Sequence, residues 1–147
     1  MSKVSIGKKV PNFELPATSE QNIKLSALKG KKVVLYFYPR DSTPGCTTEG
    51  QDFRDNHNKF KRANTVILGV SRDSIKSHDN FKAKQEFPFE LLSDKDETLC
   101  GLFDVIKEKM LYGKKHMGIE RSTFLIDEKG VLDRKSTRLN SSHVALS

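Results

Sequence analysis

Cysteine is scarce in this sequence of 147 residues, which contains only Cys46 and Cys100 and no tryptophan. Two distant cysteines are too few for a structural zinc site or for the disulfide framework of a small secreted domain. No apolar run approaches the ~20 residues that span a bilayer, and the first residues show no signal-peptide pattern. We therefore expect a cytoplasmic protein with free thiols, no membrane contact and no metal.

Positive charge exceeds negative charge, with 26 Lys and Arg against 19 Asp and Glu and a formal net charge of +7. The basic residues are scattered and acidic residues lie close to the densest groups, which favours a solvated surface over a nucleic-acid site. His57, His78 and His116 show no metal-ligand spacing and are predicted to be surface histidines. For Glu49 and Arg54, on the same predicted helix as Cys46, the first interpretation is a surface ion pair of little energetic value, and the secondary one is support of the active-site network.

Alternating strands and helices are predicted along one domain. Blocks of β-branched and aromatic residues indicate buried strands, in residues 31–39, 64–73, 89–94 and 121–127. Amphipathic spacing and capping residues indicate helices, in residues 48–63, 74–87 and 96–105. Residues 10–15 and 22–28 alternate as an N-terminal β-hairpin, and residues 127–130 form a turn. This order predicts an α/β fold of thioredoxin type.

The last residues follow no such pattern. The segment DRKSTRLNSSH, which begins at Asp133, resembles one reading frame of a sequencing-library adapter, and the alternative interpretation is a disordered terminus. We expect a domain over residues 1–132 and a non-native or disordered tail over residues 133–147. On this interpretation the native C-terminal strand and helix of the fold are missing, and the chain is only marginally stable.

One cysteine stands at a place suited to a reactive thiol. In TPGC, Thr43 fits a helix N-cap and Pro44 fits the first helical position, which places Cys46 in the first turn beside unpaired amides. These amides and the positive helix end stabilise a thiolate, which is the nucleophilic form of cysteine. An arginine brought in from elsewhere would add a stronger charge, and Arg121 at the start of a predicted strand is the candidate.

The residues around this cysteine resemble the active-site loop of peroxiredoxins. FYPRDSTPGCTTEGQDFRD contains Pro39, Thr43 and Cys46 in the arrangement P-x-x-x-T-x-x-C, and this segment with GIERSTFLID is similar to the bacterioferritin comigratory protein (peroxiredoxin Q) branch. The resemblance extends from about Val4 to Leu132. It implies reduction of hydrogen peroxide and organic hydroperoxides with no cofactor.

The resemblance also implies a role for each residue. Cys46 would attack one peroxide oxygen and become a sulfenic acid. Thr43 would hold the peroxide, Arg121 would stabilise the thiolate and the charge that develops as the oxygen–oxygen bond breaks, and Pro39 would pack over the sulfur. The reductant would be thioredoxin, glutaredoxin or a small thiol, and the protein would be a monomer or a dimer.

The sequence leaves the recycling step open. Many relatives carry a resolving cysteine five residues after the first, where this chain has Gln51. Cys100 is the remaining candidate, but its neighbours Leu99, Leu102 and Phe103 favour a buried packing role. We therefore expect a one-cysteine cycle with an external thiol. The alternatives are a thiol–disulfide oxidoreductase, which lacks its C-x-x-C motif here, and a redox-sensing or basic binding module without turnover.

Overall fold

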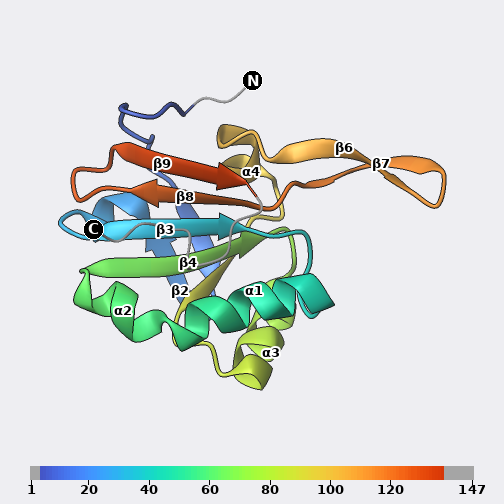
Figure 1. Cartoon of the computed structure of the whole chain (residues 1–147), viewed down its shortest axis with the longest axis horizontal. Coiled ribbons are helices and arrows are strands. Elements are labelled where there is room, and N and C mark those ends of the chain that lie inside the picture. The colour runs from blue at the N-terminus through green and yellow to red at the C-terminus, as the bar shows by residue number, and fades with distance from the viewer. Residues whose placement is uncertain (1–3, 138–147) are drawn as a thin grey trace.

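The computed structural model describes residues 4–137, which form a central sheet with helices on both faces (Figure 1). The sheet has seven strands in the order β2-β1-β5-β4-β3-β8-β9, and a separate two-stranded sheet pairs β6 with β7. The three strands β3, β4 and β5 are parallel, and the flanking pairs are antiparallel. The predicted α/β architecture is confirmed.

The strands and helices alternate along the first two thirds of the chain. The strands are β1 (Glu14–Ala17), β2 (Gln21–Lys24), β3 (Lys32–Phe37), β4 (Thr65–Ser71), β5 (Glu90–Ser93), β6 (Ile106–Leu111), β7 (Lys114–Ile119), β8 (Ser122–Ile126) and β9 (Leu132–Thr137). The helices are the 3-10 helix η1 (Leu25–Leu28) and the α-helices α1 (Pro44–Asp55), α2 (His57–Arg62), α3 (Ile75–Gln85) and α4 (Thr98–Leu102).

Strand β3 lies inside the sheet, between β4 and β8, and its two faces border two hydrophobic cores. Successive side chains of a strand point to opposite faces. Val33, Leu35 and Phe37 join one core, together with residues of η1 and α4. Val34, Tyr36 and Tyr38 join the other core, which includes the buried phenylalanines of α1, α2 and α3. The first three α-helices therefore cover one face of the sheet, as Figure 1 shows below the strands.

The predicted N-terminal hairpin is present as β1 and β2, although its second arm is shorter than expected. Leu15 pairs with Ile23, and the chain then turns into η1 at Leu25. The helix predicted over residues 48–63 is divided in two at Asn56, whose side-chain amide donates to the carbonyl oxygen of Asp52 at 2.8 Å.

The expectation that the fold lacks its closing strand is wrong for residues 132–137. They form β9, which pairs antiparallel with β8 and places Lys135 opposite Phe124. An edge strand is held by main-chain hydrogen bonds, which do not require the alternating apolar pattern on which the prediction relied. The rest of the proposed tail lies outside the described residues. The expected loss of a C-terminal helix and the origin of the tail therefore stay predictions.

Strands β6 and β7 were not predicted from the sequence. They form a hairpin that extends away from the main sheet (Figure 1), with Tyr112 and Gly113 at its turn in positive-φ conformations of 52° and 75°. Met110, Tyr112 and Met117 are exposed there. Gly113 was the available signal for a turn. The flanking residues do not alternate between apolar and polar, which is the pattern that predicts a half-buried strand.

We predict that Gly50→Ala destabilises the protein by about 1–3 kcal/mol. A methyl group at Gly50 in α1 would overlap the ring of Phe87, which is 3% exposed and packs against Phe81 and Phe89, each with its ring centroid 5.0 Å away. Urea denaturation measures the effect.

The matched control is Gly101→Ala in α4, where an added methyl group meets no atom within 4 Å. Because alanine has the higher helix propensity, Gly101→Ala should leave the unfolding midpoint unchanged or raise it. Equal losses in the two variants would contradict the packing argument.

Candidate active site

The loop between β3 and α1 contains most of the predicted site. Pro39 is half-buried just beyond β3, and Thr43 stands at the N-cap position of α1 with φ −83° and ψ 154°, as expected. Its hydroxyl makes no capping bond, however, and donates instead to the carbonyl oxygen of Arg40 at 2.9 Å. The hydroxyl oxygen keeps its lone pairs available as acceptors.

Cys46 is the third residue of α1, as the cap assignment predicted, and is 2% exposed. Its sulfur lies in the first turn, where backbone N–H groups have no partner within the helix. Its side chain belongs to the core on the helical face of the sheet. The thiol is therefore held in place and shielded from large molecules.

Arg121, the residue before β8, contacts this sulfur. Its Nη2 donates to Cys46 Sγ at 3.3 Å. The register of β3 and β8 brings this about, because Phe37 pairs with Ser122, so the residue before β8 lies where β3 passes into the loop. Gly45 leaves room for the guanidinium, since a Cβ there would lie 3.2 Å from Nη2. The predicted pairing of Arg121 with Cys46 is present in the structure.

Glu49 completes the charged group, which is the secondary of the two interpretations that the sequence left open for it. Its Oε1 accepts a hydrogen bond from Arg121 Nη1 at 2.7 Å, and the side chain is 6% exposed. The predicted surface pair with Arg54 is wrong, because Arg54 instead pairs with Asp55. Glu49 is one helical turn after Cys46, so both side chains project on the same side of α1. That spacing was the available signal.

Burial of the Glu49 carboxyl raises its pKa to about 7, although the neighbouring Arg121 guanidinium acts in the opposite direction. Its second oxygen, Oε2, is buried without a hydrogen-bond partner in the described part of the chain. The carboxyl thus lies in a site where its charged form is only partly compensated.

Cys100 lies on the other face of the sheet from Cys46. It is fully buried in the core that contains Leu99 and Phe103. Its backbone N–H donates to Asp94 Oδ2 at 2.6 Å. Burial, followed by the nearby Asp94 carboxylate, raises the pKa of the Cys100 thiol. The structure therefore does not bring the two cysteines together, and both are free.

The prediction that His78 is a surface residue is wrong. Its side chain is fully buried and its Nδ1 lies 2.7 Å from Asp41 Oδ2. Asp41 belongs to the loop between Pro39 and Thr43, so this contact ties α3 to the site. The sequence signal for burial was weak, because helix α3 carries mostly polar residues.

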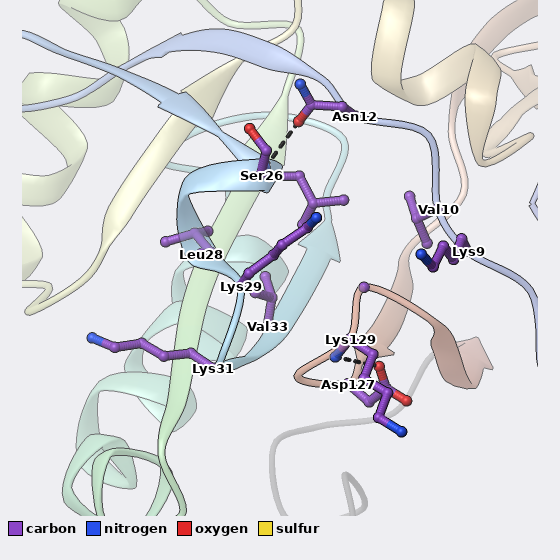
Figure 2. Close-up of a pocket in the computed structure, with 12 residues that line it drawn as sticks. Lys9, Val10, Asn12, Ser26, Leu28, Lys29, Lys31, Val33, Asp127 and Lys129 are labelled. Carbon is purple, nitrogen blue, oxygen red and sulfur yellow. Dashed lines mark hydrogen bonds between the residues drawn. The ribbon is translucent and has the colours of Figure 1, made fainter.

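A cavity of about 180 Å³ lies at the opposite end of β3, beside Val33. Figure 2 shows lysine side chains around it, including Lys9, Lys29 and Lys129. Its lining contains no cysteine or histidine. This cavity therefore does not contribute to chemistry at Cys46.

Among the described residues, no helix is both long and apolar enough to cross a membrane.

A buried cysteine at a helix N-terminus, with a guanidinium at its sulfur and a thioredoxin-like sheet behind it, defines a thiol-based redox enzyme. The AhpC/TSA family model matches residues 6–135. Peroxiredoxin Bcp of Bacillus subtilis is 50% identical over 143 residues, covering 97% of this chain and 91% of that protein. Peroxiredoxin Bcp of Xanthomonas campestris is 58% identical over 120 residues, covering 80% and 75%.

Solved structures agree with these relatives. Peroxiredoxin Q of Xanthomonas campestris has a TM-score of 0.85 at 49% identity, covering 93% of this chain and 89% of that one. A peroxiredoxin Q mutant of Xylella fastidiosa has a TM-score of 0.88 at 44% identity, covering 95% and 89%. The chain belongs to the AhpC/TSA family, within its Bcp/peroxiredoxin Q branch, and is a thiol-dependent peroxidase. The predicted thioredoxin-like fold is confirmed.

We predict that Glu49→Gln changes how stability depends on pH. A carboxyl with a folded-state pKa of about 7, against an ordinary value of 4.5, binds a proton more readily in the folded protein. Its contribution to stability is therefore complete at low pH and is lost as pH rises through about 7. Wild-type protein should lose stability relative to Glu49→Gln between pH 5 and 8, by up to a few kcal/mol.

Urea denaturation of both proteins across this range gives the difference in unfolding free energy. The difference should stop changing above about pH 8.5, where Glu49 is ionised in both folded and unfolded protein. Parallel curves from pH 5 to 8 would show that Glu49 is not a buried, partly compensated carboxyl.

Proposed function

We propose that this peroxidase uses Cys46 as its peroxidatic nucleophile, in a one-cysteine cycle that an external thiol completes. The observation that carries the proposal is the hydrogen bond from Arg121 Nη2 to the Cys46 sulfur at the N-terminus of α1. A cation and unpaired amides beside a sulfur stabilise its anion, which is the form that attacks peroxides.

In the oxidation step the Cys46 thiolate attacks one oxygen of the hydroperoxide. A sulfur–oxygen bond forms, the oxygen–oxygen bond breaks, and the second oxygen leaves as hydroxide or alkoxide, which takes a proton to become water or an alcohol. Cys46 is oxidised by two electrons to a sulfenic acid. The Arg121 guanidinium stabilises the negative charge as it moves from sulfur to the leaving oxygen.

Thr43 and Pro39 orient the peroxide and shield the sulfur in this proposal. Because the Thr43 hydroxyl already donates its hydrogen bond to the carbonyl oxygen of Arg40, its oxygen acts toward the substrate as an acceptor for the peroxide O–H. Pro39 has no N–H and a fixed φ, so it limits loop motion and water access beside the thiol. Hydrogen peroxide is small, and orientation accounts for much of its activation.

The reduction step returns Cys46 to its thiol form. One external thiol attacks the sulfenic sulfur, which releases water and gives a mixed disulfide, and a second thiol then displaces Cys46. The position of Cys100 supports an external source, because the sheet lies between its core and that of Cys46. Thioredoxin, glutaredoxin or a small thiol has the required chemistry.

The proposed substrates are hydrogen peroxide and organic hydroperoxides. The bacterioferritin comigratory protein of Xanthomonas campestris is 48% identical to this chain, with a TM-score of 0.85. Its structures, of a trapped intermediate and ligand complex, were used to study its alkyl peroxide reduction activity. Its match covers 94% of this chain and 90% of that one. A cytoplasmic location and a monomeric or dimeric state are further parts of the proposal, and the two free cysteines suit a reducing compartment.

The competing proposal is a redox-sensing or basic binding module in which Cys46 is oxidised without turnover. Repeated consumption of peroxide in the presence of excess dithiothreitol favours the enzyme, whereas a single equivalent consumed favours the sensor. Cys46→Ser should abolish consumption in either case, and any polyanion binding should persist in this variant and weaken with salt.

The intact mass after one equivalent of peroxide tests the recycling step. We expect a gain of one oxygen on Cys46 in both wild-type protein and Cys100→Ser. In a parallel sample that contains dimedone, the sulfenic acid should instead give a Cys46–dimedone thioether with loss of water. Loss of two hydrogens in wild-type protein, absent from Cys100→Ser, would show an internal disulfide and contradict the one-cysteine cycle.

We predict that Thr43→Val lowers the second-order rate constant of Cys46 oxidation by roughly 10- to 100-fold, because the acceptor for the peroxide is lost. Thr43→Ser keeps the hydroxyl and should stay within a few-fold of wild type. Stopped-flow measurement with hydrogen peroxide gives both constants. Equal rates for the valine and serine variants would remove the hydroxyl from the mechanism.

A further inference from the structure

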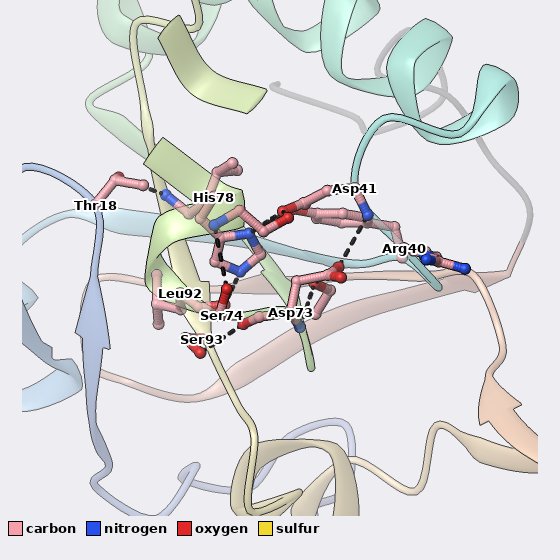
Figure 3. A network of polar contacts seen from close by, with 12 residues as sticks. Thr18, Arg40, Asp41, Asp73, Ser74, His78, Leu92 and Ser93 are labelled. Carbon is pink, nitrogen blue, oxygen red and sulfur yellow. Dashed lines mark hydrogen bonds and ion pairs between the residues drawn. The ribbon is translucent and has the colours of Figure 1, made fainter. Parts of the chain in front are cut away.

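The buried imidazole of His78 uses both of its nitrogen atoms (Figure 3). Nε2 lies 2.9 Å from the carbonyl oxygen of Leu92. A carbonyl oxygen only accepts hydrogen bonds, so Nε2 carries a proton. Nδ1 lies 2.7 Å from Asp41 Oδ2, with the side chains of His78 and Asp41 0% and 2% exposed. One further proton is shared across this contact.

Asp41 accepts two more hydrogen bonds, both from side-chain hydroxyls. The Tyr38 hydroxyl donates to Oδ1 at 2.6 Å and the Ser77 hydroxyl donates to Oδ2 at 2.7 Å. Burial raises the pKa of Tyr38, so its hydroxyl remains a donor. His78 and Asp41 thus form a buried hydrogen-bonded pair that the Tyr38 and Ser77 hydroxyls support. Removal of one partner leaves the other without its hydrogen bond in the core.

The main chain of Asp41 is also held. Its backbone N–H donates to Asp73 Oδ2 at 2.9 Å, and the Ser71 hydroxyl donates to the same oxygen at 2.6 Å. The Ser93 hydroxyl donates to the carbonyl oxygen of Asp73 at 2.6 Å. The residue is therefore attached, by side chain and backbone, to α3 and to the ends of β4 and β5.

The ligand atoms of Asp41, Asp73 and His78 all lie within 4.8 Å of one another, a spacing that also suits a metal ion. Each of these atoms already has a hydrogen-bond partner within the protein, as described above. The internal bonds account for the cluster without an ion. We therefore interpret it as a structural anchor.

Ser42, which follows Asp41 of this anchor, has an unfavourable backbone conformation. Ser42 has φ +62°, in the left-handed region that costs a non-glycine residue roughly 1 kcal/mol or more. Such a conformation persists only where its surroundings impose it. Asp41 is fixed on one side of Ser42, and α1 with its buried Cys46 is fixed on the other. If the anchor is lost, the chain between them is free to relax.

We propose that His78 is a positioning residue of the peroxidase: through Asp41 it holds residues 42–46 in the conformation in which Arg121 contacts the Cys46 sulfur. The proposal rests on the function proposed above and adds to it a residue that lies outside the loop. It implies that loss of the anchor lowers the reactivity of Cys46 with peroxide and raises its accessibility to other reagents. When it weakens, Cys46 loses its oriented donors and reacts more slowly with peroxide, but it becomes more accessible to other reagents.

His78→Gln tests this, because glutamine keeps a polar side chain of similar length but has no ring that can contact both Asp41 and the Leu92 carbonyl. We expect the rate constant of Cys46 oxidation by hydrogen peroxide to fall 10-fold or more. We expect the rate of Cys46 alkylation by iodoacetamide to rise several-fold, as measured by the mass of the Cys46 peptide. Circular dichroism and urea denaturation establish that the variant is folded in both assays.

Two further variants separate positioning from loss of stability. Ser77→Ala removes one hydrogen bond to Asp41 and keeps the contact between His78 and Asp41, so it should shift both rates in the same directions by about two- to threefold. Thr65→Val removes a buried hydroxyl that donates to the carbonyl oxygen of Ala63 at 3.1 Å, at the far end of β4 from Ser71. It should lower stability and leave both rates at their wild-type values.

The proposal is overturned if folded His78→Gln and Ser77→Ala both stay within twofold of wild type in the two assays. It is also overturned if the oxidation and alkylation rates of Cys46 both fall in the His78 and Ser77 variants. Altered rates in Thr65→Val would overturn it as well, because they would show that the rates follow stability. The alkylation assay needs no peroxide. If wild-type protein consumes no peroxide, the proposed function fails, and the alkylation rates of His78→Gln and Ser77→Ala still decide whether the anchor positions Cys46.

Discussion

The hydrogen bonds that one guanidinium makes to two side chains of α1 are the interaction on which the rest of this site depends. Arg121 donates to Cys46 through one nitrogen and to Glu49 through another. The antiparallel register of β3 and β8 sets its position, because Phe37 lies opposite Ser122. Main-chain pairing of two central strands thus places a cation at a thiol that is 75 residues away in the sequence. A shift of that register by one residue would turn the arginine to the other face of the sheet.

In the proposed mechanism the site acts through charge and orientation. A peroxide offers few atoms to bind, so stabilisation must come from groups that are already oriented before the reaction begins. The buried Glu49 carboxyl holds one side of the Arg121 fork, and its raised pKa of about 7 reflects burial that the arginine only partly offsets. The protein therefore carries an unfavourable charge close to the thiol. Such a cost is common where a fold keeps ionisable groups oriented for chemistry.

The same sheet supports the loop and separates the cysteines. The loop before α1 is bonded through Asp41 to the ends of β4 and β5 and to α3, so it is attached to three elements of the core. Cys46 lies over the helical face, and Cys100 lies among apolar residues of the other face. With one thiol oriented and the other enclosed, the arrangement favours reduction by a partner. Because Cys46 is 2% exposed, the proposed reduction by a protein thiol implies a change in the loop that uncovers the sulfur.

Local patterns determined much of this protein. The sequence predicted the buried strands, the start of α1 at Pro44 and the P-x-x-x-T-x-x-C motif. It could do so because periodicity, capping and proline act within a few residues. Tertiary structure decided the partner of Glu49, the burial of His78, the separation of Cys46 from Cys100, and the pairing of β9 and of the β6–β7 hairpin. The first three depend on contacts between residues distant in the chain. The last two join strands that are neighbours in the sequence, but their polar or exposed side chains give no periodic signal from which the strands could be predicted.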